Sequence, residues 1–156
     1  MQILIDIPSQ TLSLLGDDGA CIRRYSVSTA RNGAGEASGS FCTPRGRHII
    51  RARIGAGAPI GAAFRGRRPT GEVWTPELAA ANPGRDWILT RILWLSGTEP
   101  GFNRLGEVDS MRRYIYIHGT PGTAPLRLPA ARGPVVGRQR AGAHRVRLAP
   151  AAGARA

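Results

Sequence analysis

The chain has 156 residues, 22 arginines, no lysine, ten acidic residues and a formal net charge of +12. This length suffices for one domain with a hydrophobic core, and no run of apolar residues is long enough to predict a membrane span. The two cysteines are too few for a disulfide framework and lie in no metal-ligand spacing, so we expect neither a metal site nor a cofactor.

The N-terminal part alternates apolar and polar residues with the period of a β-strand. Strands are expected at residues 2–7, 11–15 and 21–28, and Asp17-Asp18-Gly19 is a hairpin signal between the last two. The opening therefore predicts a β-meander. Residues 29–47 are rich in glycine but match neither common phosphate-loop motif, so a long connection is favoured over a phosphate site.

The middle of the chain predicts further strands at 48–54, 62–67 and 87–95. Before the last of these, Thr75 as N-cap, Pro76 at the first helical position and Glu77 in the first turn predict a short helix that ends at 82–84. About seven strands, counting one more at 111–121, and one short helix predict a mainly-β sandwich or barrel.

The two cysteines have structural interpretations. Cys21 precedes Ile22 in an expected strand, which predicts a buried thiol. For Cys42 we favour a thiol in the core. Because Cys42 lies six residues before His48, a Cys–His nucleophile pair is the alternative.

A strand expected at 111–121 carries Tyr114-Ile-Tyr-Ile-His118-Gly119, which would place an imidazole at the end of a half-buried strand. Such a histidine can serve as a general base. In the apolar strand at 87–95, Arg91 is expected to pair with a carboxylate or to line a pocket.

The order Thr43-Pro44-x-Gly46, a strand, and then Tyr114-Ile-Tyr-Ile-His118-Gly119-Thr120 resembles the L,D-transpeptidase catalytic domain of the YkuD type. The resemblance covers about residues 1–129 and implies a β-sandwich enzyme of bacterial cell-wall metabolism. Such enzymes cut the bond between meso-diaminopimelate and D-alanine in a peptidoglycan tetrapeptide stem. They hold the stem as a cysteine thioester and pass it to an amine of a second stem.

The resemblance implies roles for particular residues. His118 maps onto the base that activates the cysteine, and the backbone of Gly119 and Thr120 would orient its ring. Thr120 and Arg91 are then expected to contact substrate. The family's downstream Ser/Thr-His-Gly-Cys motif falls on Ala131-Arg132-Gly133-Pro134, where only the glycine matches. Since proline has neither a nucleophile nor an N–H for an oxyanion hole, no transpeptidase activity is expected.

The end of the chain differs in composition from the rest. Residues 127–156 hold seven arginines and no acid, and 23 of these 30 residues are Ala, Arg, Gly or Pro. The codons of these four residues begin with two G/C bases. A GC-rich gene that is read in the wrong frame would give such a composition. Gly137 to Ala141 can be encoded so that the next frame reads Val-Asp-Asn-Ala, similar to the family's sequence after its cysteine. We therefore interpret 1–129 as the domain and 130–156 as a frameshifted or disordered tail.

Two alternatives of other classes stay open: a non-catalytic module that binds peptidoglycan or protein, and a basic tail that binds nucleic acid, which is the weaker expectation. The resemblance implies stem peptides as partners and a place in the periplasm or cell envelope. No signal peptide is recognisable, so the chain as written would be cytoplasmic. A monomer is expected. Because no strand is predicted after Val136, residues 111–118 are expected to form an unpaired sheet edge.

Overall fold

The computed structural model describes residues 1–121, 134–138 and 146–148, and in these residues the chain is mainly β. The strands are β1 (Gln2–Asp6), β2 (Thr11–Leu15), β3 (Cys21–Ser28), β4 (Gly46–Ile54), β5 (Ala62–Arg65), β6 (Arg68–Val73), β7 (Ile88–Gly97), β8 (Tyr116–Gly119), β9 (Pro134–Arg138) and β10 (Val146–Leu148). The helices are α1 (Pro76–Ala80) and a 3-10 turn at Gly106–Val108.

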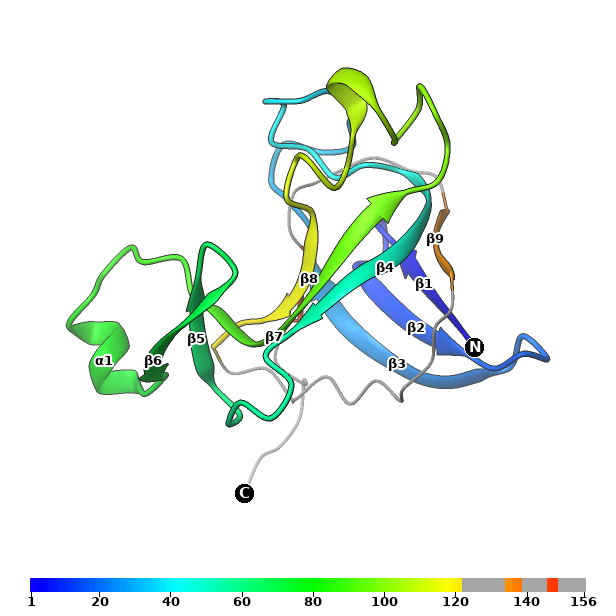
Figure 1. Ribbon diagram of the computed structural model, residues 1–156. Coiled ribbons are helices and arrows are strands. Elements are labelled where there is room, and N and C mark those ends of the chain that lie inside the picture. Colours follow the sequence, from blue (N-terminus) through cyan, green and yellow to red (C-terminus); the bar gives the residue numbers. More distant parts are fainter. Residues whose placement is uncertain (122–133, 139–145, 149–156) are drawn as a thin grey trace.

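Two layers of strands enclose the main core. β1, β2 and β3 form the antiparallel meander that the sequence predicts, and β4, β7 and β8 form the facing layer (Figure 1). Their inward side chains alternate with outward ones, as one-sided burial of a strand requires. The core between them consists of Ile3, Ile5, Ile7, Leu12, Leu14, Val27, Leu93, Leu95, Ile115 and Ile117. The prediction of a mainly-β sandwich is confirmed.

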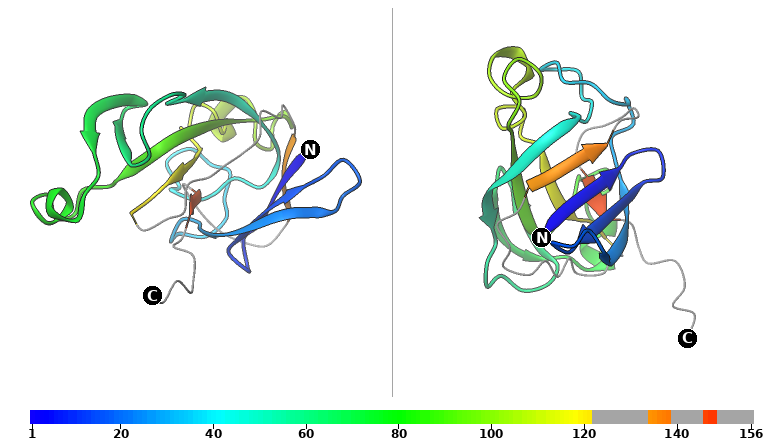
Figure 2. Two further views of the ribbon diagram at one scale, coloured as in Figure 1. Left: turned by 90° about the horizontal axis from the view of Figure 1, so that it is seen from below. Right: turned by 90° about the vertical axis from the view of Figure 1, so that its right-hand side faces the viewer.

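Two strands from the end of the chain join these layers. β9 pairs in parallel with β1 and antiparallel with β4, and β10 pairs in parallel with β8 and antiparallel with β3. Figure 2 shows β9 between β1 and β4. The expectation of an unpaired edge near residues 111–118 is therefore wrong, because β8 has β7 on one side and β10 on the other. Backbone pairing needs no apolar periodicity, which is why the sequence pattern missed both strands.

A hairpin and a helix extend beyond the two layers. β5 pairs with β7, and β6 continues the sheet outward from β5. The helix α1 follows, next to the hairpin (Figure 1). It starts as predicted: the Thr75 hydroxyl accepts a hydrogen bond from the Leu78 N–H at 3.1 Å, and Pro76 is the first helical residue. Ala63, Trp87 and Leu89 form a small core cluster apart from the main one, against which Leu78 packs.

Three local predictions need correction. The strand expected at 111–121 shrinks to β8, because Asp109 accepts hydrogen bonds from the Arg112 and Leu105 N–H groups and Tyr114 has a left-handed φ of 57°. The strand β6 was not expected. Cys21 is exposed rather than buried, since β3 buries Val27 and leaves its first residues in solvent.

Candidate active site around His118

His118 lies on β8 with only 1% of its surface exposed. Its Nδ1 is 2.8 Å from the carbonyl oxygen of Gly119. A carbonyl can only accept, so Nδ1 carries the proton and, in the neutral ring, Nε2 keeps the lone pair. The Gly119 carbonyl thus orients the ring, as the family resemblance implied for the backbone after the histidine, and it leaves Nε2 as the basic nitrogen of the neutral ring. The role of His118 as a general base stays a prediction.

The strand next to His118 is irregular where the two strands face each other. Leu89 pairs with Gly119 and Ile92 pairs with His118, so Thr90 and Arg91 form a bulge opposite the His118–Gly119 peptide. Thr90 has a φ of 68°, an uncommon conformation for a β-branched residue, and its hydroxyl accepts a hydrogen bond from the Gly61 N–H at 3.2 Å. Bulges and strained residues of this kind concentrate at functional sites.

The predicted substrate residue Arg91 lies in this bulge, half-buried. Its guanidinium donates to the carbonyl of Thr90 at 2.5 Å, and no ion pair between described residues involves it. The structure therefore places Arg91 on the strand that pairs with His118 and Gly119. Its contact with substrate, and that of the half-buried Thr120, stay predictions.

An aromatic cluster lies on the His118 side of β8, because Tyr116 and His118 are two residues apart on one strand. The ring of Tyr116 meets Trp94 edge-on at a centroid distance of 6.0 Å, and Tyr114 lies 6.2 Å from the same indole. The Trp94 Nε1–H donates to the Met111 carbonyl at 3.1 Å. Sequence reasoning did not single out this aromatic cluster, which joins residues from two strands and a turn.

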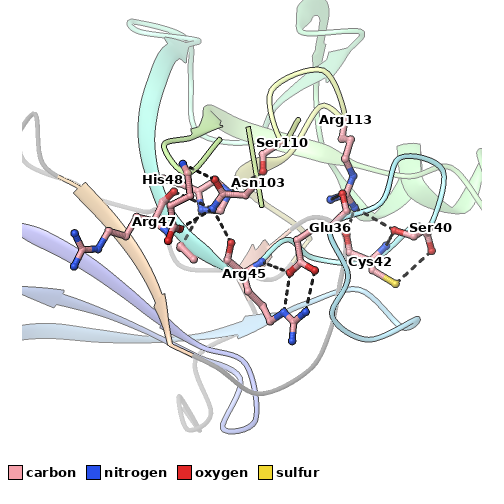
Figure 3. Close-up of polar contacts among 11 residues, drawn as sticks. Glu36, Ser40, Cys42, Arg45, Arg47, His48, Asn103, Ser110 and Arg113 are labelled. Carbon is pink, nitrogen blue, oxygen red and sulfur yellow. Dashed lines mark hydrogen bonds and ion pairs between the residues drawn. The ribbon is translucent and has the colours of Figure 1, made fainter. Parts of the chain in front are cut away.

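The alternative pair of Cys42 and His48 does not form. The Cys42 thiol donates to the carbonyl oxygens of Asn32 and Ser40 at 3.3 and 3.4 Å. His48 is buried, and its Nε2 lies 2.8 Å from the Ser110 hydroxyl while Nδ1 lies 3.2 Å from the Gly46 carbonyl (Figure 3). Burial lowers the pKa of His48. Ser110 has no exposed surface, so this His–Ser contact is structural rather than catalytic.

The polar contacts in Figure 3 connect the loop before β4 to the loops around residues 97–113. Asn103 donates to the carbonyls of Arg45 and Arg47, and Arg113 donates to the carbonyls of Glu36 and Cys42. Arg45 pairs with Glu36 at 2.7 Å, which lowers the pKa of that carboxyl. The glycine-rich loop is thus a connection fixed by its neighbours, in agreement with the interpretation favoured over a phosphate site.

The positions that align with the family's cysteine motif are only partly within the described residues. Ala131, Arg132 and Gly133 lie outside them. Pro134 is the first residue of β9, opposite Ile49 of β4. In the order of paired strands, β9 is followed by β4, β7 and then β8, so two strands separate β9 from β8. The structure therefore does not bring the backbone of Pro134 next to His118. The loss of the motif stays a prediction from the sequence.

Searches of the described residues found no cluster of His, Cys, Asp and Glu that could bind a metal ion, and no helix that is long and apolar enough to cross a membrane. Comparison with curated proteins and with solved structures returned no match. A family model described as the L,D-transpeptidase catalytic domain, YkuD, matches residues 1–139. The match covers most of the chain and agrees with its mainly-β fold, so the chain belongs to the L,D-transpeptidase catalytic domain family, whose members act in peptidoglycan cross-linking.

Proposed function

We propose that this chain binds peptidoglycan tetrapeptide stems at the site around His118 and that, as written, it does not carry out acyl transfer. The observation that supports a stem-binding site is the geometry of His118, whose Nδ1–H is fixed on the Gly119 carbonyl beside a strained bulge. The mainly-β fold and the family match support the substrate class.

In the reaction that the family resemblance implies, a thiolate attacks the carbonyl between diaminopimelate and D-alanine. The amide C–N bond breaks, D-alanine leaves with a proton from the imidazolium, and a thioester remains. An amine of a second stem then attacks the thioester, gives its proton to the imidazole and releases the thiolate. His118 supplies the proton transfers of this scheme, and a thiol within reach of its Nε2 is the group that the scheme needs in addition.

Neither cysteine fits that requirement. Cys21 is exposed at the start of β3, in the meander, and Cys42 lies in the loop before β4 with its thiol on two backbone carbonyls. Proline at 134 offers no nucleophile, and the residue preceding the aligned glycine is Arg132 rather than histidine. These substitutions support the proposal that no thioester forms.

The test is intact-mass analysis of the full chain after incubation with a carbapenem, which acylates a catalytic thiolate. We expect no mass increase, and none in a Pro134→Cys variant either, because one restored thiol does not restore the second histidine or the loop. A stoichiometric adduct on the unaltered chain that disappears in His118→Ala would contradict the proposal.

We further propose that the protein acts as a monomer in the cell envelope, where peptidoglycan stems are found. Analytical ultracentrifugation tests the oligomeric state, and fractionation of cells tests the location.

A further inference from the structure

The hairpin β5–β6 places an arginine in an unusual backbone conformation. Arg65 pairs with Arg68, so Gly66 and Arg67 form the two-residue turn, with φ values of 56° and 69°. Both values are positive, as a type I′ turn requires, and such turns favour glycine or asparagine. An arginine in the left-handed region costs conformational energy, and residues of this kind persist where surrounding contacts or a function retain them.

The guanidinium of Arg67 lies in the aromatic cluster. Its central carbon is 4.6 Å from the ring centroids of both Trp94 and Tyr114, within the range of cation–π attraction. One of its N–H groups donates to the Tyr116 hydroxyl at 3.0 Å. Three aromatic side chains from β7, β8 and the turn between them therefore determine the position of this cation.

These contacts leave most of the hydrogen-bonding capacity of Arg67 unused. A guanidinium has five N–H donors in a planar fork that matches the two oxygens of a carboxylate. The contact with Tyr116 uses one donor, the Tyr114 side chain is a second hydrogen-bonding partner, and no ion pair between described residues involves Arg67. The side chain is half-buried at a hairpin tip, so a carboxylate arriving from solvent can reach it.

The position of Arg67 relative to His118 follows from β8. Tyr116, which binds the guanidinium, is two residues before His118 and on the same side of the strand, so their Cα atoms are about 7 Å apart. Arg67 is the member of this group that a peptide reaches from solvent, because the side chains of Tyr116 and His118 are buried. A stem peptide carries carboxylates at its C-terminus and on diaminopimelate, close to the bond that the family cuts.

We propose that Arg67 is the residue of this chain that recognises a carboxylate of the stem peptide, through a bidentate contact made by the guanidinium that Trp94, Tyr114 and Tyr116 position. The inference rests on the proposed stem binding and adds to it the residue and the chemical group that determine specificity. The aromatic faces keep the fork oriented, and a hydrogen bond between two charged groups is stronger than one between neutral groups.

The experiment is isothermal titration of the full chain with two probes: the tetrapeptide L-Ala-γ-D-Glu-meso-diaminopimelate-D-Ala, and the same peptide amidated at both carboxylates that flank the last bond. We expect the acid to bind about tenfold to a hundredfold more tightly, as a charge-assisted hydrogen-bonded pair provides. Arg67→Met should remove most of this preference, so that the acid and the amide bind about equally. Arg67→Lys should keep only part of it, since lysine lacks the planar fork of donors. Arg68→Met is the matched control, because Arg68 is exposed on the same hairpin and should leave the preference unchanged.

The outcomes separate this inference from the proposed function. Equal binding of acid and amide by the unaltered chain would overturn the role of Arg67 and leave stem binding intact. Binding of neither probe would overturn both. If Arg67→Met lowers the melting temperature but keeps the acid preference, the arginine only anchors the hairpin and the inference is wrong.

Discussion

Asn103 offers the sharpest test of how the loops beside the sheet are organised. It has no exposed surface and lies between the glycine-rich loop and the end of β7. Its Nδ2 lies 2.9 Å from the Arg45 carbonyl, 3.1 Å from the Arg47 carbonyl and 3.1 Å from Glu99 Oε2, while Oδ1 accepts from the Glu99 N–H at 3.0 Å. We predict that Asn103→Ala strongly destabilises the protein.

The magnitude follows from these contacts. An amide nitrogen has two hydrogens, so the three Nδ2 contacts amount to two full hydrogen bonds, and Oδ1 adds a third. At about 1 kcal/mol each, the loss is about 3 kcal/mol, and leaving buried partners unsatisfied adds about 1 kcal/mol or more. Asn103→Asp should cost more still, because a carboxylate cannot donate to the two carbonyls and would face the Glu99 carboxylate.

Urea unfolding followed by tryptophan fluorescence measures the change. The matched control is Asn32→Ala, since Asn32 is exposed and its side chain donates one hydrogen bond of 3.3 Å to the Ser40 carbonyl; its effect should stay within about 0.5 kcal/mol. If Asn103→Ala and Asn32→Ala differ by less than about 1 kcal/mol, the loops do not depend on this amide and the reasoning is refuted.

Other side chains give further tests. Burial lowers the pKa of His48 below its unfolded value, so below about pH 6.5 the unfolded chain binds more protons than the folded one. The free energy of unfolding should therefore fall as the pH drops from about 6.5 through the folded pKa. His48→Asn should flatten this part of the profile of urea midpoint against pH, and an unchanged slope would contradict the assignment. The hydrogen bond from Arg85 lowers the pKa of Glu72 to about 2, so an NMR titration should find a midpoint near that value, and Arg85→Gln should move it toward the ordinary range. Thr75→Ala removes the N-cap of α1 and should cost about 1 kcal/mol, whereas Thr75→Ser should be nearly neutral. The gene should contain a Ser-His-Gly-Cys sequence in another frame near codons 122–134; its absence from both alternative frames would refute the frameshift interpretation.

The sequence predicts those elements that local chemistry determines. The meander of β1 to β3 follows from alternation and an Asp-Gly turn, and α1 follows from a cap whose partners lie within one helical turn. The turn before β8 escaped prediction because its alternating residues also fit a strand. There the Asp109 carboxylate accepts hydrogen bonds from backbone N–H groups and holds the chain in a turn, although the apolar pattern fits a strand.

The candidate site is predictable only in part, for a similar reason. The bond from His118 to Gly119 joins adjacent residues, and the family resemblance carried by their motif implied it. The environment of Arg67 depends on residues that are 27 or more positions away, which no spacing in the sequence indicates. Likewise, nothing in the composition of the tail indicates β9 and β10, because their pairing uses backbone groups.

The central claim is that the chain retains a stem-binding site with its base and lacks the nucleophile. Mass spectrometry of the full chain incubated with the tetrapeptide stem tests both parts at once, recorded first under native and then under denaturing conditions. We predict a complex with the intact tetrapeptide in the native spectrum and the mass of the unmodified chain after denaturation. A covalent adduct that survives denaturation and corresponds to the stem without D-alanine would contradict the claim, and so would the absence of any native complex.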